Sequence, residues 1–142
     1  MDKAEQQDLT GLSVKTSKQL EQELRKLARL GRRSFREAVV YFLEVMLALC
    51  VQRPSFRLEP SAEDETDCMS GQIKLPVSRE LYDRLFHKAG EYGLKVPELV
   101  RLLLRMALSF HQKFVPGNQV VRKEDFLAVI LESLDERTRL IQ

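Results

Sequence analysis

The chain has 142 residues, of which 44% are hydrophobic and 31% are charged. These proportions are typical of a globular protein with a buried core, and they exclude an intrinsically disordered chain. The first ten residues are polar and no long uncharged apolar run follows, so we expect a cytoplasmic protein without a signal peptide or a membrane contact. The two cysteines, Cys50 and Cys68, form no C-x-x-C motif, which argues against a disulfide framework or a zinc site.

The formal net charge of +2 is distributed unevenly along the chain. Residues 11–52 and residues 71–114 each contain eight Lys or Arg and four Asp or Glu, a charge of +4 in each block. Residues 1–10, 53–70 and 115–142 carry −2, −3 and −1. Two basic blocks flanked by acidic segments indicate that the positive charge serves a purpose within each block.

The two basic blocks repeat one pattern at a constant offset along the chain. The matched pairs include Ser17 and Ser78, Leu20 and Leu81, Leu24 and Leu85, and Ala28 and Ala89. Gly93 falls one place after the match of Gly31, which we interpret as a difference in loop length. A unit of this size is too small to bury its apolar face alone, so we expect the two units to share a core.

The first unit, residues 11–52, begins with alternating side chains that predict a half-buried strand. Its inward residues are Leu12, Val14 and Thr16, and its outward residues are Ser13 and Lys15. Ser17 is a favourable N-cap for an amphipathic helix that ends at Gly31. A second helix begins near Ser34, and its apolar composition predicts a central place in the core.

The second unit, residues 71–114, repeats this order. Its strand has Ile73, Leu75 and Val77 on the apolar side and Gln72, Lys74 and Pro76 on the other. Ser78 caps the first helix and Gly93 ends it. Pro97 suits the first turn of the second helix, where its missing N–H costs nothing.

Two further segments complete the chain. Residues 53–70 contain two prolines and several acids, and they read as a flexible linker. In residues 119–142 the sequence predicts a C-terminal helix from Arg122 to Leu140. One side of this helix is apolar and is formed by Phe126, Ile130, Leu134 and Ile141. This side either docks on the core of the same chain or binds a partner.

The order strand, helix, glycine turn and helix resembles the ribbon-helix-helix (Arc/MetJ-type) family of DNA-binding proteins. The stretch "IKLPVSRELYDRLFHKAGEYGLKVPELVRLLLRMAL" carries the resemblance most strongly. Two units in one chain are similar to the tandem accessory protein of F-type conjugative plasmids. The resemblance implies a mostly α fold with a short two-stranded antiparallel ribbon, built as a tandem pseudo-dimer with an added C-terminal helix. It also implies that the ribbon enters the major groove of double-stranded DNA.

The resemblance assigns base contacts to the outward ribbon residues Ser13, Lys15, Gln72 and Lys74. The chemistry agrees, because Lys can donate to guanine, Gln can pair with adenine and Ser can serve either. Pro76 takes the third outward position of its strand, cannot donate, and favours a short ribbon. The alternative is an ordinary solvent-facing strand surface.

The start of each second helix is the candidate phosphate site, since helix N-termini attract anions. The candidate residues are Arg29, Arg32, Arg33, Ser34, Arg36 and Lys95. Cations near a helix start are unfavourable unless a partner supplies negative charge, so the arginines of the first unit point to phosphate. The alternative is a solvated basic surface.

These observations predict a sequence-specific DNA-binding protein, either a transcriptional repressor or a plasmid or viral DNA accessory factor. No catalytic motif or metal-ligand spacing is found, so we expect neither an enzyme, nor a cofactor, nor a small-molecule substrate. Self-association on DNA and a two-chain dimer with exchanged units are left open. The competing hypothesis is a protein–protein interaction or assembly module that uses the C-terminal helix.

Overall fold

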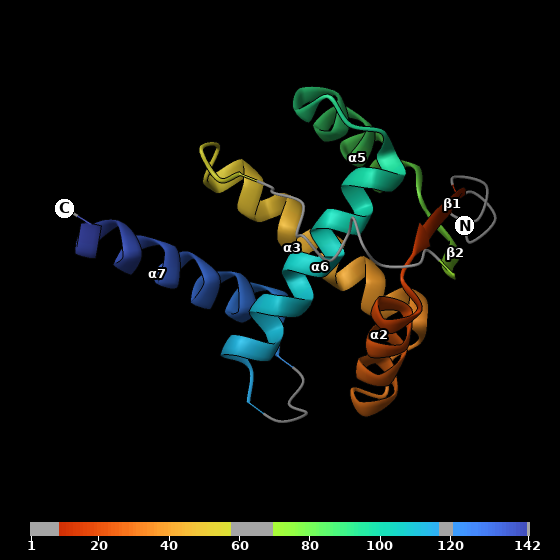
Figure 1. The fold of residues 1–142 in the computed structure, drawn as a ribbon, viewed down its shortest axis with the longest axis horizontal. Helices are drawn as coiled ribbons and strands as arrows, with labels where there is room; N and C mark the ends of the chain where they lie inside the picture. The colour runs from red at the N-terminus through yellow and green to blue at the C-terminus, as the bar shows by residue number, and fades with distance from the viewer. Residues whose placement is uncertain (1–8, 58–69, 117–120, 142) are drawn as a thin grey trace, which may run out of the picture.

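The structure is a computed structural model that describes residues 9–57, 70–116 and 121–141, with side chains described as far as Glu136. These residues form seven elements in the order β1 (Leu9–Thr16), α2 (Lys18–Leu30), α3 (Phe35–Gln52), β2 (Gly71–Ser78), α5 (Arg79–Tyr92), α6 (Val96–Phe114) and α7 (Lys123–Ile141). The fold is therefore mostly helical with one two-stranded sheet, as the sequence predicted (Figure 1). Most of the expected linker, including Cys68, lies outside the described residues.

The two strands form an antiparallel ribbon that is paired from Leu9↔Ser78 to Thr16↔Gly71. Side chains alternate as predicted: Leu12, Val14, Thr16, Ile73, Leu75 and Val77 are buried, and the residues between them are exposed. The expected shortening at Pro76 is wrong, because pairing continues through it to Ser78. Each strand is an edge of this sheet, and a proline is tolerated at an edge.

The predicted caps are present at both first helices. The Ser17 hydroxyl accepts a hydrogen bond from the backbone N–H of Leu20 at 3.2 Å, and the Ser78 hydroxyl accepts one from Leu81 at 3.1 Å. Each cap satisfies a donor that a helix start leaves unpaired. The two helices bury matching sets of residues, Leu20, Leu24 and Ala28 in α2, and Leu81, Leu85 and Ala89 in α5.

The turns between the helices correct one prediction. Gly31 has an ordinary φ of −86°, and the left-handed position is taken by Arg32, at φ 54°. Gly93, at φ 69°, has the same role in the second unit. The residue after each then donates its N–H to an alanine carbonyl at 2.8 Å, Arg33 to Ala28 and Leu94 to Ala89. The two turns thus have equal length, and the shifted glycine reflects a non-glycine residue in a left-handed conformation.

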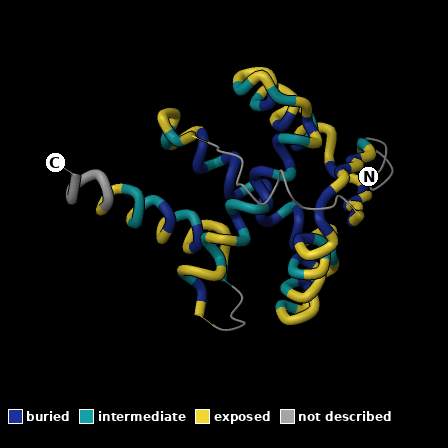
Figure 2. Tube along the Cα trace, in the orientation of Figure 1, coloured by how far each residue is buried: buried dark blue, intermediate teal, exposed yellow. Residues whose placement is uncertain are grey.

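The helices α3 and α6 cross at the centre of the molecule, where both are largely buried (Figures 1 and 2). Their apolar sequences predicted this place. Leu43, Met46, Leu99 and Leu103 have no exposed surface, and Cys50 of α3 is also buried. The ribbon covers one side of this pair, with β1 contacting α6 and β2 contacting α3. The core therefore depends on both units at once.

The helix α7 docks on the core by its first half and extends away from the ribbon (Figure 1). Phe126 and Ile130 have no exposed surface, and the Phe126 ring stacks on Tyr41 at 6.0 Å between centroids. Arg53 closes the far end of this contact, with its guanidinium 2.8 Å from the Asp135 carboxylate. Of the two alternatives for this apolar side, the described residues show docking on the chain's own core.

Replacement of Phe126 by Ala is expected to lower the free energy of unfolding by about 3–5 kcal/mol, because it leaves a cavity between three helices. Val129→Ala is the matched control, since Val129 lies on the same helix and is 39% exposed. Its loss should stay below about 1 kcal/mol. Urea denaturation followed by circular dichroism measures both. Equal small losses would mean that α7 is not docked in solution.

Candidate nucleic-acid interface

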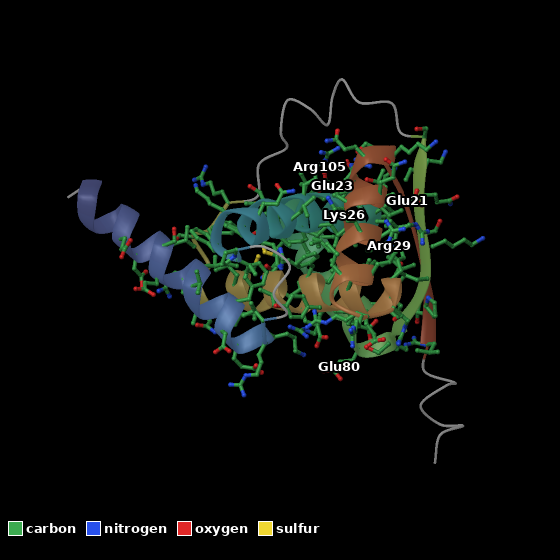
Figure 3. All side chains as sticks on the ribbon, turned by 90° about the horizontal axis from the view of Figure 1, so that it is seen from below. Glu21, Glu23, Lys26, Arg29, Glu80 and Arg105 are labelled. Carbon is green, nitrogen blue, oxygen red and sulfur yellow. The ribbon has the colours of Figure 1, made fainter. Side chains whose placement is uncertain are left out.

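The ribbon brings the four predicted base-contact residues together on one exposed face. The register pairs Ser13 with Lys74 and Lys15 with Gln72, so the four side chains form two adjacent cross-strand pairs. The Gln72 side-chain amide donates to the Ser13 hydroxyl at 3.0 Å. In Figure 3 the ribbon is seen from the side at the right-hand edge of the molecule, with side chains extending from it into solvent. This face offers hydrogen-bond donors and acceptors to a ligand that contacts the ribbon along its length.

Two arginines hold the ribbon against the crossing helices. Arg36 at the start of α3 donates from Nε to the carbonyl oxygen of Pro76 at 2.7 Å. Arg101 in α6 donates from Nη1 to the carbonyl oxygen of Lys15 at 3.1 Å. Pro76 is the counterpart of Lys15 in the repeat, so the two accepting carbonyls lie at matching places in the two units, whereas the two arginines are not counterparts of each other. Each contact fixes the position of one end of the ribbon.

A third contact ties the beginning of β2 to α2. The Glu21 carboxylate accepts hydrogen bonds from the backbone N–H of Gln72 at 3.0 Å and from Arg25 at 2.9 Å. These bonds lower the pKa of Glu21, the Gln72 N–H being the larger cause. Gly71 lies so close that an added Cβ would be 2.8 Å from the carbonyl oxygen of Ser17. The glycine therefore permits the close approach of strand and helix.

The predicted phosphate residues are distributed over different environments. Arg29 and Arg32 are exposed beside the turn between α2 and α3, and Figure 3 shows Arg29 on the α2 surface. Arg33 is instead turned inward, with its guanidinium 4.3 Å from the centroid of the Tyr41 ring. Arg36 uses one of its donors on Pro76. Arg29 and Arg32 thus have the open positions, while Arg33 supports the protein's own packing.

Both second helices begin with a glutamate that binds the N-cap. The backbone N–H of Ser34 donates to Glu37 at 3.2 Å, and that of Lys95 donates to Glu98 at 3.1 Å. The Ser34 N–H also lowers the pKa of Glu37, so this carboxylate is negative at neutral pH. The chain itself therefore supplies part of the negative charge that the sequence assigned to a partner. A phosphate at these N-caps has to share the backbone donor with the carboxylate.

The two helix starts nevertheless differ in charge. Residues 29–37 contain four arginines and one glutamate, a formal charge of +3. The matching residues 90–98 contain one lysine and two glutamates, a formal charge of −1. Lys95 is thus the single cation of its turn. The positive potential that attracts polyanions is concentrated at the start of α3.

Another surface feature among the described residues is a hollow of mixed charge. A shallow hollow of about 250 Å³ between α3, α5 and α7 is lined by Glu44, Val45, Ala48, Arg84, Lys123, Glu124 and Leu127. Its charges are mixed, and Lys123 pairs with Glu44 at 3.3 Å. Among the described residues, no three His, Cys, Asp or Glu side chains gather as a metal ion requires. None of the described helices has the length and apolar composition needed to cross a bilayer.

Comparison with models of known protein families, with curated proteins and with solved structures found no match for this chain. The geometry of the ribbon and its flanking helices is therefore the basis for inferring what the protein binds.

Sequence reasoning missed Glu21, Arg101 and Arg105, which position the ribbon. Arg105 donates to the Ser17 hydroxyl at 3.2 Å. Arg101 and Arg105 are one helical turn apart within an otherwise apolar helix, and this spacing puts both on one face. That signal was available, because a core helix with two arginines on one face needs polar partners there. Glu21 gave no comparable signal, since its partner is a backbone N–H in a distant part of the sequence.

Replacement of Arg32 by Gly is expected to raise the free energy of unfolding by about 0.5–1 kcal/mol, because it relieves the left-handed conformation. That relief is worth about 1–2 kcal/mol, and the added freedom of the unfolded chain offsets part of it. Gly93→Ala, at the matching position, should lower the free energy of unfolding by about 1 kcal/mol. Chemical denaturation measures both, and a destabilised Arg32→Gly variant would contradict the assigned conformation.

Replacement of Glu21 by Gln is expected to lower stability at pH 7 by about 1 kcal/mol, because an ionised acceptor binds the Gln72 N–H more strongly than an amide. The pKa of Glu21 is lowered in the folded state, so its contribution is complete above the unfolded value near 4.5 and is lost as the pH falls through the folded value. The stability difference between wild type and variant should therefore shrink below pH 4.5.

Thermal melts from pH 7 to pH 3 test this expectation. Glu23→Gln is the control on the same helix, because Glu23 accepts from the Gln112 side chain at 3.1 Å and not from a strand N–H. A difference between wild type and Glu21→Gln that stays constant over this pH range would show that the charge of Glu21 is not the cause.

Proposed function

We propose that this chain is a sequence-specific double-stranded DNA-binding protein that inserts the β1–β2 ribbon into the major groove. The carrying observation is the exposed face formed by Ser13, Lys15, Gln72 and Lys74 on a ribbon with its other face buried. A major groove is about 12 Å wide and admits a two-stranded ribbon. Paired strands lie about 4.8 Å apart, so the outward side chains of both strands face base edges together.

The same observations support a tandem ribbon-helix-helix pseudo-dimer. Matched residues of the two units form equivalent caps on the first helices and equivalent turns, and Ser13 pairs with Lys74, its own counterpart. A rotation that exchanges the two units would therefore have its axis at this central pair. In this arrangement one chain covers two adjacent half-sites, as a dimer of single units would.

The charge distribution favours a nucleic acid over a protein ligand. The exposed arginines at the start of α3 lie next to the ribbon, because Arg36 contacts the carbonyl of Pro76. A ribbon in the groove would bring them toward the sugar–phosphate backbone that borders it. Arg29 and Arg32 would then fix the register on DNA, while the ribbon side chains provide discrimination between bases. Repressor and DNA accessory factor are both compatible with this arrangement.

The test begins with selection of binding sites from random duplexes, followed by fluorescence anisotropy on the selected duplex and a scrambled one. Lys74→Ala is expected to weaken binding to the selected duplex by about 1–3 kcal/mol and to change the scramble little. Lys113→Ala on the last turn of α6 removes the same charge and should bind as wild type.

Arg32→Gly supplies a second readout. It should weaken binding to both duplexes and reduce the slope of log K against log salt by roughly 0.9, while its folded state is more stable. Wild-type protein that binds neither duplex at low salt would refute the proposed function. A Lys74→Ala variant that binds its selected duplex as tightly as wild type would refute the assigned ribbon face.

A further inference from the structure

We infer that the two ends of the ribbon have different roles, with base readout confined to the central Ser13–Lys74 pair and the Lys15–Gln72 end, and the Gly11–Pro76 end held on DNA by phosphate contacts. This inference rests on the proposed function and adds where within the site the specificity lies. It arises from the pairing register, which places hydrogen-bonding side chains unevenly along a ribbon that is otherwise symmetric in its backbone.

The register defines a centre and two ends. Ser13 and Lys74 form the central outward pair, with Lys15 and Gln72 on one side of it and Gly11 and Pro76 on the other. Lys15 and Gln72 offer a cation and an amide to base edges. Gly11 has no side chain and Pro76 has neither an N–H nor a polar side-chain atom. One end of the ribbon can therefore hydrogen-bond to bases through side chains, and the other cannot.

We call the Gly11–Pro76 end the silent end and the Lys15–Gln72 end the reading end. The next outward pair at the silent end is Leu9 and Ser78, and it adds no side chain for hydrogen-bonding to bases. Leu9 is 40% exposed and apolar, so it can touch a thymine methyl group but cannot form a hydrogen bond. Ser78, its partner in the register, uses its hydroxyl to accept from the N–H of Leu81 at the start of α5. The outward hydrogen-bonding side chains that do not cap a helix are thus those of the central pair and the Lys15–Gln72 pair. Gln72 and Ser13 bond to each other at 3.0 Å, and the amide and the hydroxyl each keep further donor or acceptor capacity for a base.

The charge of the flanking segments is distributed in the opposite way: it is positive next to the silent end and negative next to the reading end. Arg36 contacts the carbonyl of Pro76, so the start of α3 lies at the silent end. Arg101 contacts the carbonyl of Lys15, so α6 lies at the reading end. The +3 charge of residues 29–37 is therefore next to Gly11 and Pro76, and the −1 charge of residues 90–98 belongs to the reading side. The reading end thus has the hydrogen-bonding ribbon side chains, and the silent end has the cluster of arginines.

The size of the readable block follows from geometry. Alternate residues of a strand are about 6.7 Å apart, close to two base-pair steps of about 3.4 Å. The central pair and the Lys15–Gln72 pair together span roughly three base pairs, counted from the ribbon centre toward one end. The preferred site is then a short non-palindromic block, and the phosphates contacted extend beyond it on the side that carries no base preference.

The experiment combines selection from a random duplex library with hydroxyl-radical footprinting of the full chain on the selected duplex. The informative base pairs should lie on one side of the footprint centre. Single base-pair changes in that block should weaken binding roughly fivefold or more, and changes on the other side should weaken it less than twofold.

Two variants assign the ends. Arg29→Ala combined with Arg32→Ala should remove protection of backbone sugars on the side without base preference, lower the salt slope by roughly 2 and select the same block. Gly11→Gln should add informative positions on that side, because a Cβ at Gly11 meets nothing within 4 Å. Gly11→Ala, which adds the Cβ without an amide, is the matched control and should add none.

The outcomes separate the two proposals. A palindromic block centred on the footprint, or loss of protection on the informative side in the arginine variant, would overturn this inference and leave the proposed function standing. Failure of the wild-type chain to bind any duplex at low salt would overturn the proposed function, and this inference with it.

Discussion

The antiparallel pairing of β1 with β2 is the interaction on which the rest of the structure depends. A single strand of this length has no partner for its backbone groups and cannot cover the two central helices. Once paired, the strands bury Leu12, Val14, Ile73 and Leu75 against α3 and α6 and turn their polar side chains outward. Because the alternation has a period of two, a slip of one position would exchange the buried and exposed sets.

The contacts around the ribbon maintain this register from both ends. Glu21 and Gly71 hold the beginning of β2 on α2, and Arg36 and Arg101 each hold one strand carbonyl. Glu21, Arg36 and Arg101 are charged and bind backbone groups, and such charge-assisted hydrogen bonds are stronger than neutral ones. The same cations that fix the protein's own ribbon thus lie close to the surface proposed for DNA, and packing and recognition share residues.

Much of this fold follows from local patterns in the sequence. Alternation at Leu12 and Val14 predicts the strand, Ser17 and Ser78 predict helix starts, and the constant offset between matched residues predicts two similar units. The positions of Ser13, Lys15, Gln72 and Lys74 on one outward face follow from alternation as well. These features depend on neighbours in the chain, so a periodic pattern contains enough information to predict them.

The features that sequence reasoning missed depend instead on distant partners or on backbone conformation. The left-handed Arg32 has no local signature, since glycine is the residue expected there and stands one place before it. The inward turn of Arg33 onto Tyr41 reduces the set of open phosphate contacts, and a count of arginines does not distinguish cations that face solvent from cations that pack on an aromatic ring.

The separation of the two strands along the chain also has a consequence for assembly. Thr16 and Gly71 are paired although both helices of the first unit and the linker lie between them, so forming the ribbon closes one long loop within a single molecule. The entropy of that closure grows only slowly with loop length, and it does not depend on protein concentration. A ribbon made from two separate chains would dissociate on dilution, whereas pairing within one chain is independent of protein concentration.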